Sequence, residues 1–302
     1  MKHLLSMESL TRDAIYGILE LAETMKATRG RHEKRPLAGQ CWALIFSKSS
    51  TRTRVSFEVG IRELGGSVMF LSSADIQLGR GEPIEDTARV MGRMLDGAVI
   101  RTFLQSDVEV FAEYSQIPTI NALTDDEHPC QILADLQTIR EKLGGVEGRT
   151  VCFIGDGACN VARSWVWAAA RLDFELRIAA PEGYQPDAQL LERARQTGRI
   201  IVCADPLEAV RGADVLYTDV WVSMGKEEEA LERLRVMAPY QINDRLLKEA
   251  APAAIVMHCL PAYRGKEITA ETFEAHASTL FEQAENRLHA QKAILQLIAR
   301  RS

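Results

Sequence analysis

The chain has 302 residues, of which 46% are hydrophobic and 26% are charged, a composition typical of a globular protein large enough for two domains. Its formal net charge of −6 at pH 7 gives no overall attraction to nucleic acid or anionic lipid, so any anionic ligand must be bound by a local group of cations. No apolar run approaches the roughly 18 residues of a membrane helix, and the N-terminal residues lack the apolar core of a signal peptide. These features argue against secretion and membrane insertion.

The first half of the chain alternates short apolar runs with amphipathic stretches, a pattern that predicts parallel strands joined by helices. Strands are expected at 41–46, 67–71, 98–103 and 118–123. Helices are expected at about 52–64, 84–95 and 106–115, and another helix should start near His128. Because the expected strands are apolar, helices should cover both faces of their sheet.

A stretch rich in glycine and charge at 141–150 interrupts this alternation and marks the expected domain boundary. Beyond it, strands are expected at 150–156, 175–180, 199–204, 214–219 and 253–260, and a long helix at about 284–300. The predicted fold class is α/β, with two doubly wound parallel-sheet domains. Such sheets bind ligands beyond the carboxyl ends of their strands, so functional residues are expected directly after the strands.

The six cysteines are scattered, without the paired spacing of a zinc site or a dense disulfide framework. They are Cys41, Cys130, Cys152, Cys159, Cys203 and Cys259. We therefore expect reduced thiols in a cytoplasmic protein, and neither a metal nor an organic cofactor.

The first expected strand leads directly into a helix whose opening residues suit an anion. Ser50 and Thr51 are good N-cap residues, and a helix N-terminus offers free N–H groups with a partial positive charge. Thr53 adds a hydroxyl group, while Arg52 and Arg54 add guanidinium groups that can bind phosphate oxygens in pairs. An ordinary capped helix with solvated arginines is the alternative, but two arginines and three hydroxyls within five residues favour an anion site.

The segment SSTRTRVSFE resembles the carbamoyl-phosphate signature of the aspartate and ornithine carbamoyltransferase superfamily. Six further blocks resemble the superfamily and follow in its order over nearly the whole chain. They are QLGRGEPIEDTARV (77–90), VIRTF (99–103), HPCQILADLQTI (128–139), TDVWVSMG (218–225), HCLPAYRG (258–265) and EQAENRLHAQKA (282–293). The resemblance implies transfer of a carbamoyl group from carbamoyl phosphate to an amine.

The resemblance assigns the first domain, expected at 1–142, to carbamoyl phosphate. The residues implied at its phosphate group are Ser50, Thr51, Arg52, Thr53, Arg101 and Arg287. Without the resemblance, Arg101 would be interpreted as a surface arginine at a strand end. Because Arg287 belongs to the last helix, this helix, at about 284–302, should return to the first domain.

The carbamoyl group itself would be held by His128 and Gln131. In the superfamily the matching histidine donates to the carbonyl oxygen and the glutamine accepts from the NH2 group, roles that suit both side chains. His128 before Pro129 is also an ordinary helix start. The backbone carbonyl of Leu260 is implied as a second acceptor, and Pro261 follows it in a motif that often contains a cis peptide bond.

Gln77 lies in a polar loop that, in the superfamily, reaches the carbamoyl-phosphate site of a neighbouring subunit. The resemblance therefore implies a homotrimer or a multiple of trimers. The alternative is a solvent-exposed loop in a chain that works alone.

The second domain, expected at 148–283, would select the acceptor amine. By resemblance, Asp219 can pair with the α-ammonium group of ornithine, while Ser223 and the backbone of Met224 hold its amino-acid head group. Asn160 matches an asparagine that helps bind the carboxylate, although Cys159 stands where a second asparagine is usual. The block HCLP, in place of H-P-G-P followed by arginine, argues against aspartate as the acceptor.

Cys259 follows the last expected strand and, by resemblance, faces the side-chain amine of ornithine. With Asp219 it would orient that amine in its neutral form. We expect no covalent nucleophile here, because His258 should point to the opposite face of the strand. The residues expected to be catalytic are Arg101, His128, Asp219 and Cys259.

The reaction implied is the conversion of L-ornithine and carbamoyl phosphate to L-citrulline and phosphate. A carbamoyltransferase acting on N-acetylornithine, lysine or putrescine is the nearest alternative, although the S-M-G block favours a free amino-acid head group. A nucleotide-binding oxidoreductase would need a third glycine where Asn160 stands, after Gly155 and Gly157. A non-catalytic member of the superfamily would not need the full set of site residues.

Overall fold

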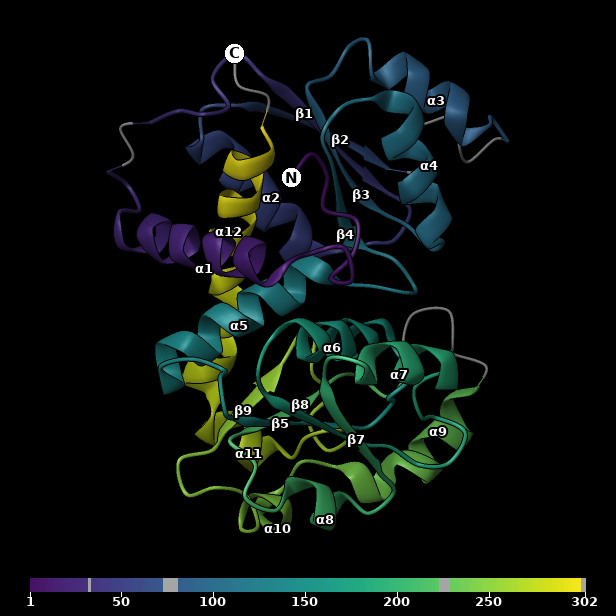
Figure 1. Ribbon diagram of the computed structural model, residues 1–302, viewed down its shortest axis with the longest axis vertical. Coiled ribbons are helices and arrows are strands. Elements are labelled where there is room, and N and C mark those ends of the chain that lie inside the picture. Colours follow the sequence, from purple (N-terminus) through teal and green to yellow (C-terminus); the bar gives the residue numbers. More distant parts are fainter. Residues whose placement is uncertain (32–33, 73–80, 223–228, 300–302) are drawn as a thin grey trace. The chain divides into compact units, whose positions relative to one another are not determined.

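The computed structural model describes residues 1–31, 34–72, 81–222 and 229–299. The chain forms two compact units. Unit 1 consists of Met1–Gln137 with Glu285–Ser302, and unit 2 consists of Thr138–Ala284. Each unit has its own sheet and its own covering helices (Figure 1).

Unit 1 contains a sheet of four parallel strands in the order β2-β1-β3-β4. The strands are β1 (Cys41–Phe46), β2 (Ser67–Ser72), β3 (Gly97–Arg101) and β4 (Thr119–Leu123). All four lie where the sequence predicts them, with small differences at their ends. The central strands β1 and β3 are buried almost throughout, as expected for a sheet with helices on both faces.

Helices α3 (Ile84–Met91) and α4 (Gln105–Ser115) pack on one face of this sheet (Figure 1). Helix α1 (Arg12–Ala27) is not among the predicted helices, although Thr11 caps it and its buried side chains recur at helical spacing. The capping residue and the spacing of apolar residues are sequence signals that predict α1, although it was not predicted.

Helices α2 (Thr51–Glu63) and α12 (Ala277–Ile298) pack against each other in unit 1. A Cβ atom at Gly60 would lie 3.2 Å from Lys292 Cγ and 3.5 Å from Leu288 Cδ1, so this glycine permits the close approach. The expectation that the last helix returns to the first domain is confirmed. Helix α12 begins at Ala277, ahead of the expected start near 284.

Unit 2 contains a sheet of five parallel strands in the order β7-β6-β5-β8-β9. The strands are β5 (Thr150–Ile154), β6 (Glu175–Ala179), β7 (Arg199–Cys203), β8 (Val215–Thr218) and β9 (Ile255–His258). The helices are α5 (Pro129–Leu143), which unit 1 shares, α6 (Asn160–Arg171), α7 (Ala188–Arg195), α8 (Pro206–Val210), α9 (Ala230–Met237), η3 (Ala238–Tyr240), α10 (Asp244–Leu247) and α11 (Ala270–Ala275). The predicted α/β class with two parallel-sheet domains is confirmed.

The two faces of the unit 2 sheet have separate apolar layers. On one face Ile154, Leu216 and Val256 pack with side chains of α8, α10 and α11. On the other, the ring of Tyr217 lies 5.7 Å from that of Phe153 and 5.5 Å from that of Trp165 on α6, between ring centroids. Within the described part of the chain, no helix combines the length and apolar character that crossing a membrane requires.

An ion pair with a buried lysine connects α12 to α2. Lys292 Nζ lies 2.7 Å from Glu63 Oε2, with the lysine side chain fully buried and the glutamate side chain 24% exposed. Burial lowers the pKa of Lys292, and the carboxylate of Glu63 opposes that effect. The ammonium group therefore depends on Glu63 for compensation of its charge.

We predict that Glu63→Gln destabilises the protein by roughly 3 kcal/mol, because it leaves a buried ammonium group without its counter-charge. The double variant Glu63→Gln/Lys292→Met should lose less, since the charge that needs compensation is gone. Urea denaturation followed by circular dichroism measures both.

Glu58→Gln is the matched control on the same helix, because among the described residues the ion-pair partners of Glu58 are the exposed arginines Arg54 and Arg62. It should cost about 0.5 kcal/mol or less. Equal losses for Glu63→Gln and the double variant would show that the ion pair does not hold these helices together.

Candidate active site

The opening turn of α2 is built as an anion cradle. Ser50 is in an extended conformation and caps the helix, with its Oγ accepting a hydrogen bond from the Thr53 N–H at 3.2 Å. The first turn has no acidic side chain to compete for the free N–H groups. The helix end thus carries an uncompensated partial positive charge beside Arg52, where the sequence predicts phosphate binding.

Three arginines gather around one buried histidine. Arg101 ends β3 and is 6% exposed, His128 directly precedes α5, and Arg287 on α12 is 3% exposed. Burial, followed by the charges of Arg287, Arg101 and Arg52, holds the pKa of His128 well below its ordinary value of 6.5. The imidazole is therefore neutral near pH 7 and has one N–H to donate. The arginines that suppress its charge leave a positive site that suits an anion.

Arg287 also joins three helices through hydrogen bonds. Its Nη2 donates to Thr53 Oγ1 at 3.1 Å on α2, and its Nη1 donates to Gln131 Oε1 at 2.5 Å on α5. The Gln131 Nε2 in turn donates to Asp135 Oδ1 at 2.8 Å. All four side chains are buried. The predicted residues Thr53, Gln131 and Arg287 thus lie in one connected network.

Arg54 has a different environment from the one the sequence suggests. Its Nε donates to Glu58 Oε1 at 2.7 Å, and its guanidinium carbon lies 3.7 Å from the centre of the Phe70 ring. The side chain is 47% exposed. Arg54 is engaged by α2 and β2, so we leave it out of the cradle.

In unit 2, three predicted residues follow neighbouring strands. Asn160 begins α6 after β5, Asp219 follows β8, and Cys259 follows β9. Since β5, β8 and β9 are adjacent and parallel, these residues share the carboxyl edge of the sheet. The Cys259 thiol donates to Asp219 Oδ1 at 2.9 Å, and the Val220 N–H donates to the same oxygen at 2.7 Å. Burial raises the pKa of the Asp219 carboxyl group.

Cys159, at the position where the resemblance led us to expect an asparagine, caps α6. Its sulfur accepts a hydrogen bond from the Ala162 N–H at 3.5 Å. Burial, followed by the charges of Asp219 and Asp156, raises the pKa of the Cys159 thiol well above its ordinary value. The substitution therefore keeps the helix cap and places a neutral side chain next to Asn160.

His258 does not point away from Cys259, and that expectation is wrong. Its Nδ1 accepts a hydrogen bond from the Leu260 N–H at 2.8 Å, and its Nε2 lies 3.2 Å from Glu267 Oε1. The reason is that β9 ends at His258 and Leu260 adopts a left-handed conformation with φ of 58°, so the alternation of side chains stops there. The peptide bond between Leu260 and Pro261 is cis.

Asp219, His258 and Cys259 form a compact cluster in which ligand atoms lie within 4.8 Å of one another, close enough for a metal ion. Among the described residues, each of these groups is already hydrogen-bonded to another part of unit 2. The His258 ring uses both nitrogen atoms, and the Cys259 thiol bonds to Asp219. We therefore interpret the cluster as a hydrogen-bonded group and assign no metal to it.

Gly157 has a structural role that accounts for its identity. A Cβ atom there would lie 2.8 Å from Ile178 Cγ2 and 3.1 Å from the Tyr184 carbonyl oxygen. Close packing alone therefore explains why residue 157 is glycine, and a bound dinucleotide is not needed to account for it.

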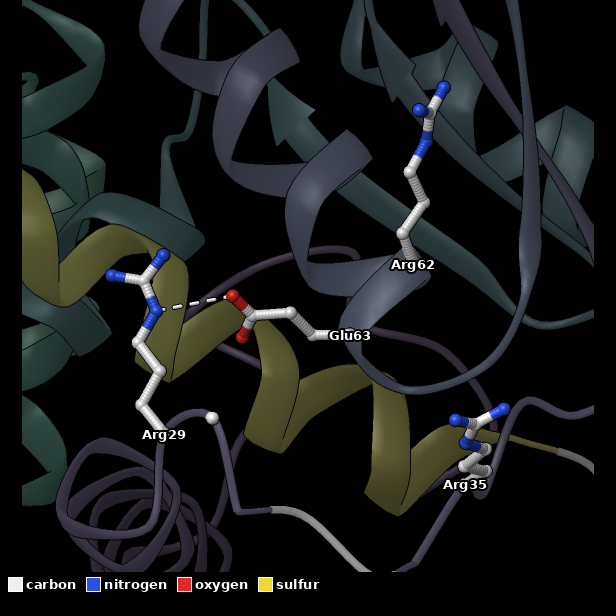
Figure 2. Close-up of a pocket in the computed structure, with 5 residues that line it drawn as sticks. Arg29, Arg35, Arg62 and Glu63 are labelled. Carbon is white, nitrogen blue, oxygen red and sulfur yellow. Dashed lines mark hydrogen bonds and ion pairs between the residues drawn. The ribbon is translucent and has the colours of Figure 1, made fainter.

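A pocket of about 490 Å³ lies elsewhere in unit 1, lined by Arg29, Gly30, Arg35, Arg62 and Glu63. Arg29 is paired with Glu63 at 3.1 Å, while Arg35 and Arg62 point in other directions (Figure 2). These cations do not converge on one point, and none of the predicted site residues that the structure describes lines the pocket.

Gln77, Ser223 and Met224 lie outside the described residues. Sequence reasoning missed Asp135 and Glu267, which hold Gln131 and His258. The spacing of Gln131 and Asp135, four residues apart on a helix, was the signal for the first pair. Glu267 had no local signal, because its partner lies on another element.

The chain matches two family models. Residues 2–141 match the one described as aspartate/ornithine carbamoyltransferase, carbamoyl-P binding domain, and residues 147–298 match the one described as aspartate/ornithine carbamoyltransferase, Asp/Orn binding domain.

Similar proteins cover nearly the whole chain. The ornithine carbamoyltransferase of Akkermansia muciniphila is 58% identical over 301 residues, which cover 99% of this chain and 98% of that protein. The ornithine carbamoyltransferase of Methanothermobacter thermautotrophicus is 54% identical over 300 residues, with 98% of each chain covered. The solved structure of the ornithine carbamoyltransferase from Pyrococcus furiosus superposes with a TM-score of 0.94 at 46% identity, covering 99% of this chain and 97% of that one.

Proposed function

The chain belongs to the aspartate/ornithine carbamoyltransferase family, and from that premise we propose how it transfers a carbamoyl group from carbamoyl phosphate to L-ornithine. The products are L-citrulline and phosphate. The observation that carries this function is the match of both halves of the chain, together with relatives named ornithine carbamoyltransferase at up to 58% identity. The relatives do not favour N-acetylornithine, lysine or putrescine as the acceptor.

We propose that residues 1–142 with the helix at 284–302 bind carbamoyl phosphate and that residues 148–283 bind ornithine. The family matches at 2–141 and 147–298 support this division for the two main segments. The assignment of the last helix is supported by its place in unit 1, which includes Glu285–Ser302. The positive cluster in unit 1 and the acidic Asp219 in unit 2 support it as well, because one substrate is an anion and the other carries two amines.

The phosphate group is assigned to the opening turn of α2 and to the arginines around His128. Free N–H groups and the hydroxyl groups of 50–53 donate to phosphate oxygens, while Arg52 and Arg101 supply charge-assisted hydrogen bonds. Arg287 contributes from α12. These contacts also stabilise the negative charge on the phosphate as it leaves.

The carbamoyl group is assigned to His128, Gln131 and the backbone carbonyl of Leu260. His128 donates its N–H to the carbonyl oxygen, which gains negative charge as the amine attacks. A neutral imidazole suits this role, and burial together with the arginines around it lowers the pKa of His128 and keeps the ring neutral. Gln131 Oε1 and the Leu260 carbonyl accept from the NH2 group.

The acceptor is assigned to Asn160, Asp219, Cys259 and the segment with Ser223 and Met224. Asp219 pairs with the α-ammonium group, and Asn160 with Ser223 and the Met224 N–H binds the carboxylate end. We assign Cys259 as a hydrogen-bonding partner of the side-chain amine and not as a nucleophile. Its thiol donates to Asp219, and both ring nitrogens of the adjacent His258 are engaged by Leu260 and Glu267.

The reaction forms one bond and breaks one. The neutral side-chain nitrogen of ornithine attacks the carbonyl carbon and forms the new C–N bond. The C–O bond to phosphate then breaks, the phosphate takes the electron pair, and the proton lost by the amine ends on the phosphate. The residues named above bind and orient the reactants and stabilise charge on the two oxygens.

A panel of acceptors tests the proposed specificity. With carbamoyl phosphate saturating, ornithine should have a kcat/KM at least about tenfold above N-acetylornithine, lysine and putrescine, since each lacks or misplaces a charge-assisted contact. In Asp219→Asn the preference for ornithine over N-acetylornithine should shrink. A higher kcat/KM with any of the other amines would refute ornithine as the substrate.

We also propose that the enzyme is a homotrimer, or a multiple of trimers, and works in the cytoplasm. Free cysteines at all six positions support a reducing compartment.

Exposed apolar side chains in unit 1 offer surface for contact between subunits. They include Val55 on α2, Met69 on the edge strand β2, and Val90 and Met94 at α3. A trimer would let Gln77 complete the carbamoyl-phosphate site of a neighbour.

Subunit mixing tests this assembly. Arg52→Ala and Gln77→Ala chains should each be inactive alone, and refolding them together should restore part of the activity, because some sites then receive both intact residues. Light scattering of the wild type should give a multiple of three chain masses. A fully active monomer, or no recovery from the mixture, would contradict shared sites.

A further inference from the structure

Asp135 is a buried carboxylate that none of the roles above uses. It lies on α5 four residues after Gln131, so the two side chains share one face of the helix. Both are almost completely buried, with Gln131 1% exposed and Asp135 fully covered. A buried carboxylate is costly for a fold, so its position beside a ligand-binding amide calls for a reason.

The amide of Gln131 lies between two groups of opposite hydrogen-bonding character. Arg287 Nη1 donates to its oxygen at 2.5 Å, and its nitrogen donates to Asp135 Oδ1 at 2.8 Å. A guanidinium group can only donate, and a carboxylate can only accept. Rotating the amide by half a turn would set donor against donor and acceptor against acceptor. The chemistry of the two neighbours therefore permits one orientation of the amide.

This orientation decides what the amide presents to a ligand. The amide oxygen has two acceptor positions, and Arg287 uses one of them. The second can accept from an NH2 group on the bound substrate. An amide turned the other way would present its own NH2 group to the substrate's NH2 group and repel it.

We propose that Asp135 is a positioning residue that fixes the direction of the Gln131 amide and thereby selects an acyl phosphate bearing NH2 over one bearing a methyl group. The inference rests on the proposed function, because it requires carbamoyl phosphate to bind with its NH2 group at Gln131. Acetyl phosphate is the natural comparison, since it has the same phosphate and carbonyl groups and replaces NH2 by CH3. Inorganic phosphate reports on the phosphate cradle alone.

The test compares these three ligands in the wild type and in Asp135→Leu, which removes the acceptor at similar volume. Binding of acetyl phosphate and phosphate is measured as inhibition, and carbamoyl phosphate as KM and as affinity by calorimetry. We expect Asp135→Leu to weaken carbamoyl phosphate roughly tenfold, the effect of about one lost hydrogen bond, and the other two ligands by less than about twofold. The preference for carbamoyl over acetyl phosphate should fall accordingly.

Two further variants separate positioning from charge and from folding. Asp135→Asn keeps an oxygen that can accept from Gln131, so it should retain most of the preference, whereas a loss as large as in Asp135→Leu would overturn the proposal. If Asp135→Leu does not fold, Asp135→Ala replaces it, and the same changes in binding are expected. Thr138→Val, a buried substitution farther along α5, is the matched control and should leave the preference unchanged.

A double-variant cycle gives the sharpest outcome. If Asp135 acts only through the amide, Asp135→Leu should have no further effect on the preference in a Gln131→Leu background. Equal weakening of all three ligands in a folded Asp135 variant would show that the residue is merely structural. A wild type that neither binds carbamoyl phosphate nor forms citrulline would instead refute the proposed function, so the two failures can be told apart.

Discussion

The buried guanidinium group of Arg287 is the interaction on which the carbamoyl-phosphate half of the protein depends. It comes from the last helix of the chain and bonds to Thr53 on α2 and Gln131 on α5. A buried arginine keeps its proton. Neighbouring groups must therefore accept its hydrogen bonds, and a negatively charged partner must compensate its charge. The fold meets both demands with a hydroxyl oxygen, an amide oxygen and a site for an anion. The ion pair of Lys292 with Glu63 fixes the same helix further along, which keeps Arg287 in place.

The same positive charge sets the chemistry of His128. Burial and the arginines that we propose for phosphate binding both suppress protonation of the imidazole, so under the proposed function a single cluster gives an anion site and a neutral hydrogen-bond donor. Unit 2 has the complementary character. Asp219 is held by Cys259 and Val220, and its pKa is raised by burial, so a cationic amine that pairs with it restores the stability of its charged form. Carbamoyl phosphate is an anion and ornithine carries two amines. Correspondingly, unit 1 contains a positive cluster and unit 2 contains the acidic Asp219.

Much of this arrangement could be predicted from the sequence. Apolar runs bounded by turns located the strands of both sheets, and Arg101, Asp219 and Cys259 lie at the carboxyl ends of strands, where the sequence places them. Features that depend on tertiary context were missed. The side chain of His258 was assigned to the wrong face because β9 ends at that residue and Leu260 turns left-handed, which strand periodicity does not encode. The sequence offers Arg54 as an anion ligand like Arg52, but Glu58 and the ring of Phe70 engage its side chain in the fold. The role of Asp135 required knowledge of what lies on the other side of Gln131.

A crystal structure with a phosphonate analogue of carbamoyl phosphate, in which CH2 replaces the bridging oxygen, tests the account most directly. We predict that the phosphonate lies on the first turn of α2 within hydrogen-bonding distance of Arg52 and Arg101, with the carbonyl oxygen at His128 and the NH2 group at Gln131 Oε1. Binding of the phosphonate in the pocket lined by Arg29, Arg35 and Arg62, with the His128 cluster unoccupied, would contradict the account.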